Sequence, residues 1–308
     1  MRRLPTAWLM ALVVLIWGTT WHAIVYQVNH TTPELGVTLR FGLAGLGVLA
    51  FAAWRGQPLR LPLRAHGVLA LQGLFMYSLS YLCVYHAEKH VPSGLVAVGY
   101  SASPLLAGLG AWALWRNALT PRFVAGGVCG VLGVALIFWP ELGSASARAT
   151  AAVGLAFTVG AVLLSAVGAL VASRNGDQRM AFWPALGYGL VYGAVGSGLV
   201  LAVQVGTGQQ TLHLPAVASW WLAMAYLSGA GTVVAFAGFL TLQQRLGPGK
   251  AASVGVMTPV VALAVSTALE GYRPGALTFA GAALAIVGNV LMLRPAATVK
   301  PGAAPARQ

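Results

Sequence analysis

Long runs of apolar residues alternate along the whole chain with short polar segments that contain Arg, Pro and Gly. Each run is about 20 residues long, the length that an α-helix needs to cross a hydrocarbon core of roughly 30 Å. The segments between the runs are too short for a separate soluble domain. The pattern predicts an all-α integral membrane protein with ten transmembrane helices, over residues 7–27, 34–54, 65–86, 92–115, 121–139, 150–172, 181–204, 216–243, 248–269 and 274–293.

The composition agrees with a polytopic membrane protein. Hydrophobic residues make up 58% of the 308 residues and charged residues only 7%, whereas soluble domains carry about 25% charge. Both cysteines, Cys83 and Cys129, lie inside apolar runs, so a disulfide framework is not indicated. The first run is a full span without an evident small-residue cleavage site, and we expect it to be retained.

The net charge of +13 follows from membrane topology. With both termini in the cytoplasm, fourteen of the 18 Lys and Arg fall on cytoplasmic segments, three fall outside, and Arg40 lies within a span. Short loops rich in Lys and Arg stay in the cytoplasm, next to anionic lipid, so nucleic acid is not an expected partner. We also expect a cytoplasmic N-terminus at residues 1–6 and a disordered cytoplasmic tail at 294–308, which is rich in Ala and Pro.

A shift of 155 residues superposes similar residues of the two halves without a gap. The matches are Pro104 on Pro259, Gly94 on Gly249, Gly126 on Gly281, Gly133 on Gly288, Leu136 on Leu291 and Pro140 on Pro295. Chance agreement between two Gly-rich apolar stretches is the alternative. An odd number of spans in each half would make the second half enter the membrane upside down, as in many secondary transporters. The interpretation gives two five-helix repeats, residues 7–140 and 148–293.

Motifs in both halves resemble the EamA domains of the drug/metabolite transporter superfamily. In the second half these are Thr258 to Ala262, Ala268 to Gly271, Gly281, Gly288 and Asn289; in the first half they are Trp17-Gly18, Arg40-Phe41, Ser103-Pro104, Gly126 and Gly133. The first half departs from the pattern at Trp115-Arg116, where the second half has Glu270-Gly271. The resemblance implies a ten-helix exporter, and the Tyr-rich third span makes the chain similar to the YddG-type aromatic amino-acid exporters.

Three tyrosines in the third span are spaced four residues apart, at Tyr77, Tyr81 and Tyr85. This spacing places them on one face of a helix. Because a buried tyrosine needs a partner for its hydroxyl, we expect Tyr77 and Tyr81 to line a substrate cavity. An interfacial aromatic belt is the alternative, and it is the favoured reading for Tyr85, which lies close to the outer loop.

The first two spans contribute further binding candidates. Trp17 and Trp21 are four residues apart, and His22 lies deep in the same span. A histidine at this depth contacts a substrate carboxylate, carries a proton, or is satisfied by helix packing. Arg40 either attracts a carboxylate or pairs with Glu34, and we favour the pairing because both lie near the outer end of one helix.

Two prolines mark expected helix breaks at the cavity. Tyr100 lies four residues before Pro104, where the missing N–H leaves a backbone carbonyl for a substrate ammonium. Pro259 is expected to give a similar break near Gly255 and Met257, so Tyr100 and Met257 complete the predicted substrate-binding set.

The sequence supplies no obvious energy-coupling site. No Asp or Glu is predicted in the central membrane layer, since Glu88, Glu141 and Glu270 are expected to be solvated or interfacial. Proton antiport is therefore disfavoured, although His22 keeps it open. A phosphate-binding Walker sequence is absent, and we expect neither a cofactor nor a metal.

We therefore predict a secondary transporter of the bacterial inner membrane that exports small metabolites, most of all amino acids including aromatic ones, as a facilitator. We expect a monomer or weak homodimer whose partners are its small-molecule substrate and lipid. The alternative is an exporter of aromatic cations or drugs by proton antiport. An intramembrane enzyme would need Asp, Glu, His or Cys clustered at one depth, which the sequence does not supply. A further alternative is a scaffold protein that binds no substrate, and the inverted repeat, which is typical of secondary transporters, argues against it.

Overall fold

A computed structural model describes residues 4–116, 119–142, 145–173, 180–246, 251 and 253–293. Within these ranges the chain is helical and contains no strand. The elements are α1 (Thr6–Val28), α2 (Pro33–Trp54), α3 (Leu63–Gln72), η1 (Gly73–Leu79), α4 (Ser80–Ala87), α5 (Ser93–Tyr100), α6 (Ser103–Trp115), α7 (Pro121–Phe138), η2 (Pro140–Leu142), α8 (Ala145–Ser173), α9 (Phe182–Gly206), α10 (Ala218–Ala225), η4 (Tyr226–Val234), α11 (Ala235–Leu246), α13 (Ser253–Leu269) and α14 (Ala276–Leu293). The predicted tail 294–308, the start of the predicted ninth span at 248–250, and Pro295 lie outside the described residues.

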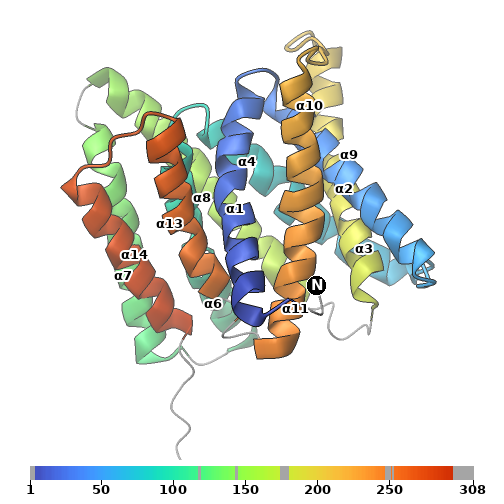
Figure 1. The fold of residues 1–308 in the computed structure, drawn as a ribbon, viewed down its shortest axis with the longest axis horizontal. Helices are drawn as coiled ribbons and strands as arrows, with labels where there is room; N and C mark the ends of the chain where they lie inside the picture. The colour runs from blue at the N-terminus through green and yellow to red at the C-terminus, as the bar shows by residue number, and fades with distance from the viewer. Residues whose placement is uncertain are drawn as a thin grey trace, which may run out of the picture.

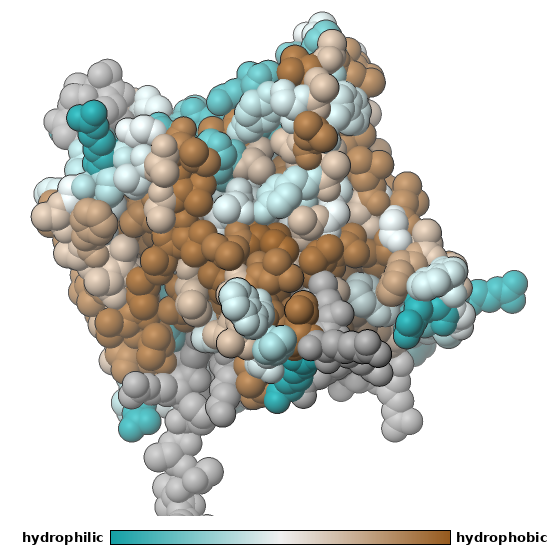
Figure 2. All heavy atoms as spheres, viewed as in Figure 1, coloured by the Kyte–Doolittle hydropathy of each residue, from teal (hydrophilic) through white to brown (hydrophobic). Residues whose placement is uncertain are grey.

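The helices lie side by side and run between two ends of the molecule (Figure 1). Eight helical stretches are long and apolar enough to cross a membrane, and two further apolar helices, Ser253–Leu269 and Ala276–Met292, are shorter. All ten coincide with predicted spans, and the count of ten spans stays a prediction. Hydrophobic side chains cover the middle of the face in Figure 2, while hydrophilic ones gather toward its upper and lower ends, as expected for a membrane-embedded bundle.

The third and eighth predicted spans each contain a π-helical segment between two α-helices. In the third, η1 follows α3 and leads into α4; in the eighth, η4 joins α10 to α11. The 155-residue shift carries residues 73–79 onto 228–234, which lie inside η4. Segments with π-type hydrogen bonds are rare and are often found at functional sites. Their recurrence at equivalent positions agrees with the repeat read from the sequence.

Glycines bring α7 and α14 together along their length (Figure 1). A Cβ added to Gly126 would lie 2.5 Å from the carbonyl oxygen of Gly288, and one added to Gly133 would lie 2.6 Å from that of Gly281. The two helices therefore run antiparallel with their backbones in contact. Residues that the shift treats as equivalent meet crosswise, as they would across a two-fold axis.

Candidate functional site

A cavity of about 360 Å³ lies among helices from both halves of the chain. Its size is near the lower end of the range of small-molecule sites, roughly 300–1,000 Å³. Aromatic side chains form much of its wall: Trp17, Trp21, Tyr77, Tyr81, Tyr100, Phe236 and Phe239. The remaining lining includes Thr20, Ile24, Arg40, Val84, Ser101, Ser103, Pro104, Ser165, Gly255, Val256, Thr258, Pro259 and Asn289.

The two tryptophans of α1 face the cavity from adjacent turns. The indole N–H of Trp17 donates to the carbonyl oxygen of Gly231 in η4 at 3.1 Å, and the ring packs against Phe236 at 5.5 Å between centroids. The ring of Trp21 meets that of Tyr100 at 5.7 Å in an edge-on contact. The aromatic wall thus joins the first helix to the eighth span and to α5.

The predicted tyrosines of η1 and α4 lie against α2. Tyr77 and Tyr81 pack on Phe41, with centroid distances of 5.6 and 4.6 Å. Tyr85, one turn further along, is fully buried, and its hydroxyl donates to Oε1 of Gln27 at 2.9 Å. The expectation of an interfacial belt is therefore wrong for Tyr85, because the ends of α1 and α2 cover this turn.

The helix of the fourth predicted span is interrupted immediately before Pro104. Helix α5 ends at Tyr100 and α6 begins at Ser103, so Ser101 projects into the cavity from the break. The Tyr100 carbonyl is not left for a ligand, because the hydroxyl of Ser103 donates to it at 2.7 Å. The amide of Asn289 in α14 donates to the Ser101 hydroxyl at 3.3 Å, which ties the break to the second half.

Pro259 lies inside α13, which continues through it. Proline has no N–H to offer to the Gly255 carbonyl, and Gly255 faces the cavity with open space where a Cβ would be. Met257 was expected to join the binding set, but it is 45% exposed and outside the cavity lining. The helical period turns residues 255, 256, 258 and 259 toward the cavity and Met257 away from it.

Arg40 is the charged side chain of the cavity wall and is only 2% exposed. Its guanidinium carbon lies 5.2 Å from the ring centre of Phe41 and 5.0 Å from that of Tyr81. The Tyr85 hydroxyl lies beside the group. Its Nε and Nη1 nitrogens have no hydrogen-bond partner among the described residues.

The predicted pairing of Arg40 with Glu34 is wrong. Glu34 is 1% exposed and lies 2.9 Å from Nε2 of His86. The amides of Gln204 and Gln210 donate to its two carboxylate oxygens at 3.4 and 3.2 Å. The carboxylate is satisfied at the end of α2, whereas Arg40 lies six residues further along the helix.

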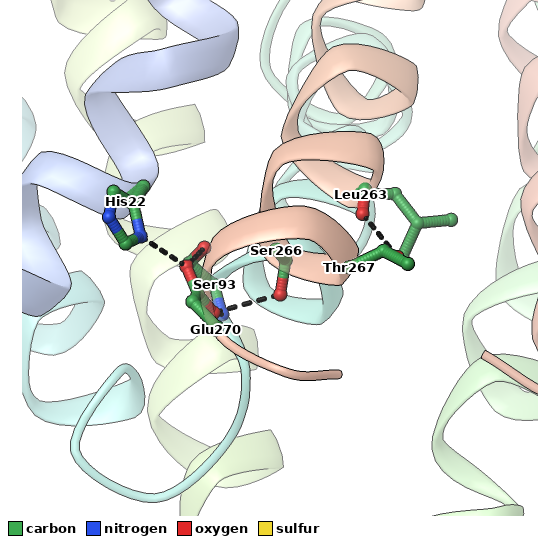
Figure 3. Close-up of polar contacts among 6 residues, drawn as sticks. All are labelled: His22, Ser93, Leu263, Ser266, Thr267 and Glu270. Atoms are coloured by element: carbon green, nitrogen blue, oxygen red, sulfur yellow. Dashed lines mark hydrogen bonds and ion pairs between the residues drawn. The ribbon is translucent and has the colours of Figure 1, made fainter. Parts of the chain in front are cut away.

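His22 also lies outside the cavity lining and pairs with Glu270 of the second half (Figure 3). The His22 Nδ1 to Glu270 Oε1 distance is 3.1 Å. The other carboxylate oxygen accepts from the backbone N–H of Ser93 at 3.0 Å and from the hydroxyl of Ser266 at 2.8 Å. Figure 3 shows these groups converging on one carboxylate, which connects α1, the first residue of α5 and the end of α13. Of the roles considered for His22, packing has direct support.

Glu88, one of the acids expected to be solvated or interfacial on the predicted outer side, is buried instead, whereas Glu141 and Glu270 have intermediate exposure. Glu88, directly after α4, is 6% exposed, and neither carboxylate oxygen has a hydrogen-bond partner in the described part of the chain. Burial raises the pKa of Glu88 well above its usual value; the charge of Glu270 adds to this, and that of Arg40 opposes it. The sequence did not indicate this burial because Glu88 lies at a helix end, where tertiary packing rather than hydropathy decides the exposure.

Comparison with known proteins agrees with these features. The model of the EamA-like transporter family matches twice, over residues 4–139 and 152–294. The chain belongs to this EamA-like transporter family. It is 28% identical over 275 residues to the uncharacterized inner membrane transporter YedA of Escherichia coli strain K12, covering 87% of this chain and 84% of YedA. It is 24% identical over 186 residues to the uncharacterized transporter YvbV of Bacillus subtilis strain 168, covering 59% of each.

A solved crystal structure shares the fold of this EamA-family chain. The two superpose with a TM-score of 0.66 over 93% of this chain and 95% of the other, at 20% sequence identity. Family membership makes the chain a multi-pass membrane protein of a transporter family. The described residues contain no group of three or more His, Cys, Asp or Glu with which a metal could be held. The lining of the cavity combines aromatic and aliphatic surface with hydroxyls, the amide of Asn289 and the guanidinium of Arg40, which is suited to reversible binding of a small molecule.

Proposed function

We propose that this EamA-family protein is a secondary transporter that exports small zwitterionic metabolites, most of all amino acids including aromatic ones, across a bacterial inner membrane. The observation that carries the proposal is the cavity, whose aromatic wall is built from both halves and whose charged member is Arg40. The rings offer a surface for apolar side chains, while the hydroxyls and the N–H groups of the guanidinium can hydrogen-bond to the polar end of the substrate. This is also the chemistry expected of the YddG-type aromatic exporters.

Alternating access of two inverted repeats, residues 7–140 and 148–293, is the proposed mechanism. The double match to the family model, the crosswise glycine pairs and the paired π-helical segments support this division. The Glu270 and Glu34 clusters join helices of the two halves at the end assigned to the outer face. In the proposed cycle these contacts separate when the cavity opens outward, and both termini remain in the cytoplasm.

Transport without strong proton coupling is supported by the cavity itself. Among the described residues that line it there is no Asp or Glu to exchange a proton for substrate. Flux then follows the substrate gradient, and cytoplasmic accumulation drives export. The alternative, antiport of aromatic cations or drugs, is disfavoured because the guanidinium of Arg40 repels a cation at the same wall.

Counterflow in proteoliposomes containing the full chain tests the proposal. Labelled phenylalanine, tryptophan, threonine, methionine and a quaternary ammonium dye are compared with and without a pH gradient. We expect amino-acid flux that is indifferent to the gradient and no dye flux. Dye flux that requires the gradient, with no amino-acid flux, would refute the proposal and establish the alternative.

A blocking substitution connects any flux to the cavity. Gly255→Leu should abolish counterflow, because its side chain would extend into the open space beside Gly255. Gly47→Leu is the matched control: Gly47 is an exposed helical residue of α2 with no atom within 4 Å of an added Cβ. Equal flux through both variants would show that the substrate path lies elsewhere.

A further inference from the structure

The guanidinium of Arg40 is a buried charge with unmade hydrogen bonds. The side chain is 2% exposed, and Nε and Nη1 have no partner among the described residues. Buried ionised groups are normally hydrogen-bonded and paired, because an unmade bond leaves the desolvation of the donor uncompensated. In this state Arg40 has aromatic faces in place of an anion, since the rings of Phe41 and Tyr81 lie 5.2 and 5.0 Å from the guanidinium carbon.

Among the described residues, Glu34, Glu270 and Glu88 make no hydrogen bond or ion pair with Arg40. Glu34 is held by His86 and two glutamine amides. Glu270 is held by His22, Ser93 and Ser266. Glu88 makes no hydrogen bond to Arg40 in the described structure.

The burial of Glu88 raises the pKa of its carboxyl well above the usual value, which favours the neutral form. The positive charge at the cavity wall therefore has no hydrogen-bonded carboxylate to balance it. An anion that entered the cavity would meet both an unpaired cation and unused donors.

The surroundings of Arg40 define the rest of the ligand. The cavity wall that contains Arg40 also contains Ile24, Val84, Tyr77 and Tyr81, which present apolar and aromatic surface. A guanidinium binds carboxylates particularly well, because its planar donors match the two oxygens. The half-buried ring of Tyr81 lies over one face of the group and adds aromatic surface beside it.

We propose that Arg40 is the carboxylate-binding residue of the cavity, so that ligands are recognised by a free carboxylate attached to an apolar or aromatic body, with or without an amine. This rests on the proposed transport function and names the substrate class of the same site. Organic cations are excluded by the same charge. Arg40 is thus the residue that separates the two substrate classes left open by the sequence.

Equilibrium binding to the purified full chain in detergent tests the site without any substitution. Phenylalanine, 3-phenylpropionate and phenethylamine share the aromatic ring and differ in the carboxylate and the amine. We expect the first two to bind and phenethylamine to bind at least roughly tenfold more weakly, because hydrogen bonds to charged groups contribute on that scale. Equal binding of phenethylamine and 3-phenylpropionate would overturn the proposal.

Substitution then assigns the effect to the residue. Arg40→Gln should weaken the two carboxylate ligands by roughly tenfold or more and leave phenethylamine unchanged. Arg55→Gln, at the exposed C-terminal end of the same helix, is the matched control and should change neither. Because Gln removes an uncompensated buried charge, the unliganded Arg40→Gln protein should unfold at an equal or higher temperature than the parent.

The outcomes separate this proposal from the transport function. Arg40-dependent binding of carboxylates without counterflow would refute transport and keep the binding site. Amino-acid counterflow that persists unchanged in Arg40→Gln, with equal binding of the amine-only ligand, would refute the binding site and keep transport. If Arg40→Gln does not fold, the ligand series on the unaltered protein still decides.

Discussion

The crossing of α7 and α14 allows a packing prediction with an internal control. A Cβ at Gly133 would lie 2.6 Å from the Gly281 carbonyl oxygen and 2.7 Å from the backbone nitrogen of Ala285. The neighbouring Gly130 lies on the same helix and has no atom within 4 Å of its added Cβ. We therefore compare Gly133→Ala with Gly130→Ala, two identical chemical changes three residues apart.

The magnitude follows from the distances. Ordinary contact begins at 3.4 Å, so the Gly281 carbonyl must retreat by about 3.4 − 2.6 = 0.8 Å. The obstructing atoms are helix backbone, which moves only with the helix, and such overpacking costs about 1–3 kcal/mol. Both variants gain up to roughly 1 kcal/mol of helix propensity. That gain cancels in the comparison, so Gly133→Ala should be less stable than Gly130→Ala by about 1–3 kcal/mol.

The assay is reversible unfolding in mixed micelles, followed by tryptophan fluorescence. Gly281→Ala should reproduce the loss of Gly133→Ala, since each Cβ meets the other backbone at 2.6 Å. The double variant should lose less than the sum, because one separation of the helices accommodates both methyl groups. Equal stabilities of Gly133→Ala and Gly130→Ala would refute the close backbone crossing.

Three further predictions concern the polar groups near the predicted outer end. The pKa of Glu88 is raised in the folded state, so as pH rises above the usual value of 4.5 the unfolded chain loses this proton first and the free energy of unfolding falls. Glu88→Gln should remove this decline, so the variant should be thermally more stable than the parent at about pH 8 but not at about pH 4. Tyr85→Phe leaves the buried Oε1 of Gln27 without its donor and should cost about 1–3 kcal/mol in the same unfolding assay, whereas no loss would argue against this bond. Glu270→Gln should weaken the anchoring of the Ser93 N–H and speed hydrogen exchange at the start of α5, and unchanged exchange would contradict the carboxylate's role there.

The sequence predicted the elements well because each apolar run had the length and the polar boundaries of a span. It did not predict η1 and η4, since a change of hydrogen-bond register from i+4 to i+5 leaves hydropathy unchanged. Pro104 and Pro259 illustrate a second limit. Both lack an N–H, yet the helix is interrupted only before Pro104 and continues through Pro259. Tertiary packing decides whether a helix continues through a proline.

The candidate site was predicted in part for similar reasons. Spacing of four residues correctly grouped Trp17 with Trp21, but it could not show which face Met257 occupies near the end of a short helix. The pairing of Arg40 with Glu34 was inferred from proximity along one helix. Glu34 is instead bound by His86 and by the side-chain amides of Gln204 and Gln210. These partners are distant from Glu34 in the sequence, and no sequence pattern indicated the contact.

The contact between Ser93 and Glu270 also bears on how the protein is made. The backbone N–H of Ser93, the first residue of α5, donates to the carboxylate of Glu270, which is synthesised 177 residues later. At a translation rate of about 5–20 residues per second, the N–H of Ser93 waits roughly 10 to 35 s for this partner. During that interval the first half is already in the membrane with one helix start unsatisfied, so its final packing is delayed until the ninth span arrives. Loss of Glu270 would then act on biosynthesis, by lowering the yield of assembled protein, as well as on the finished molecule.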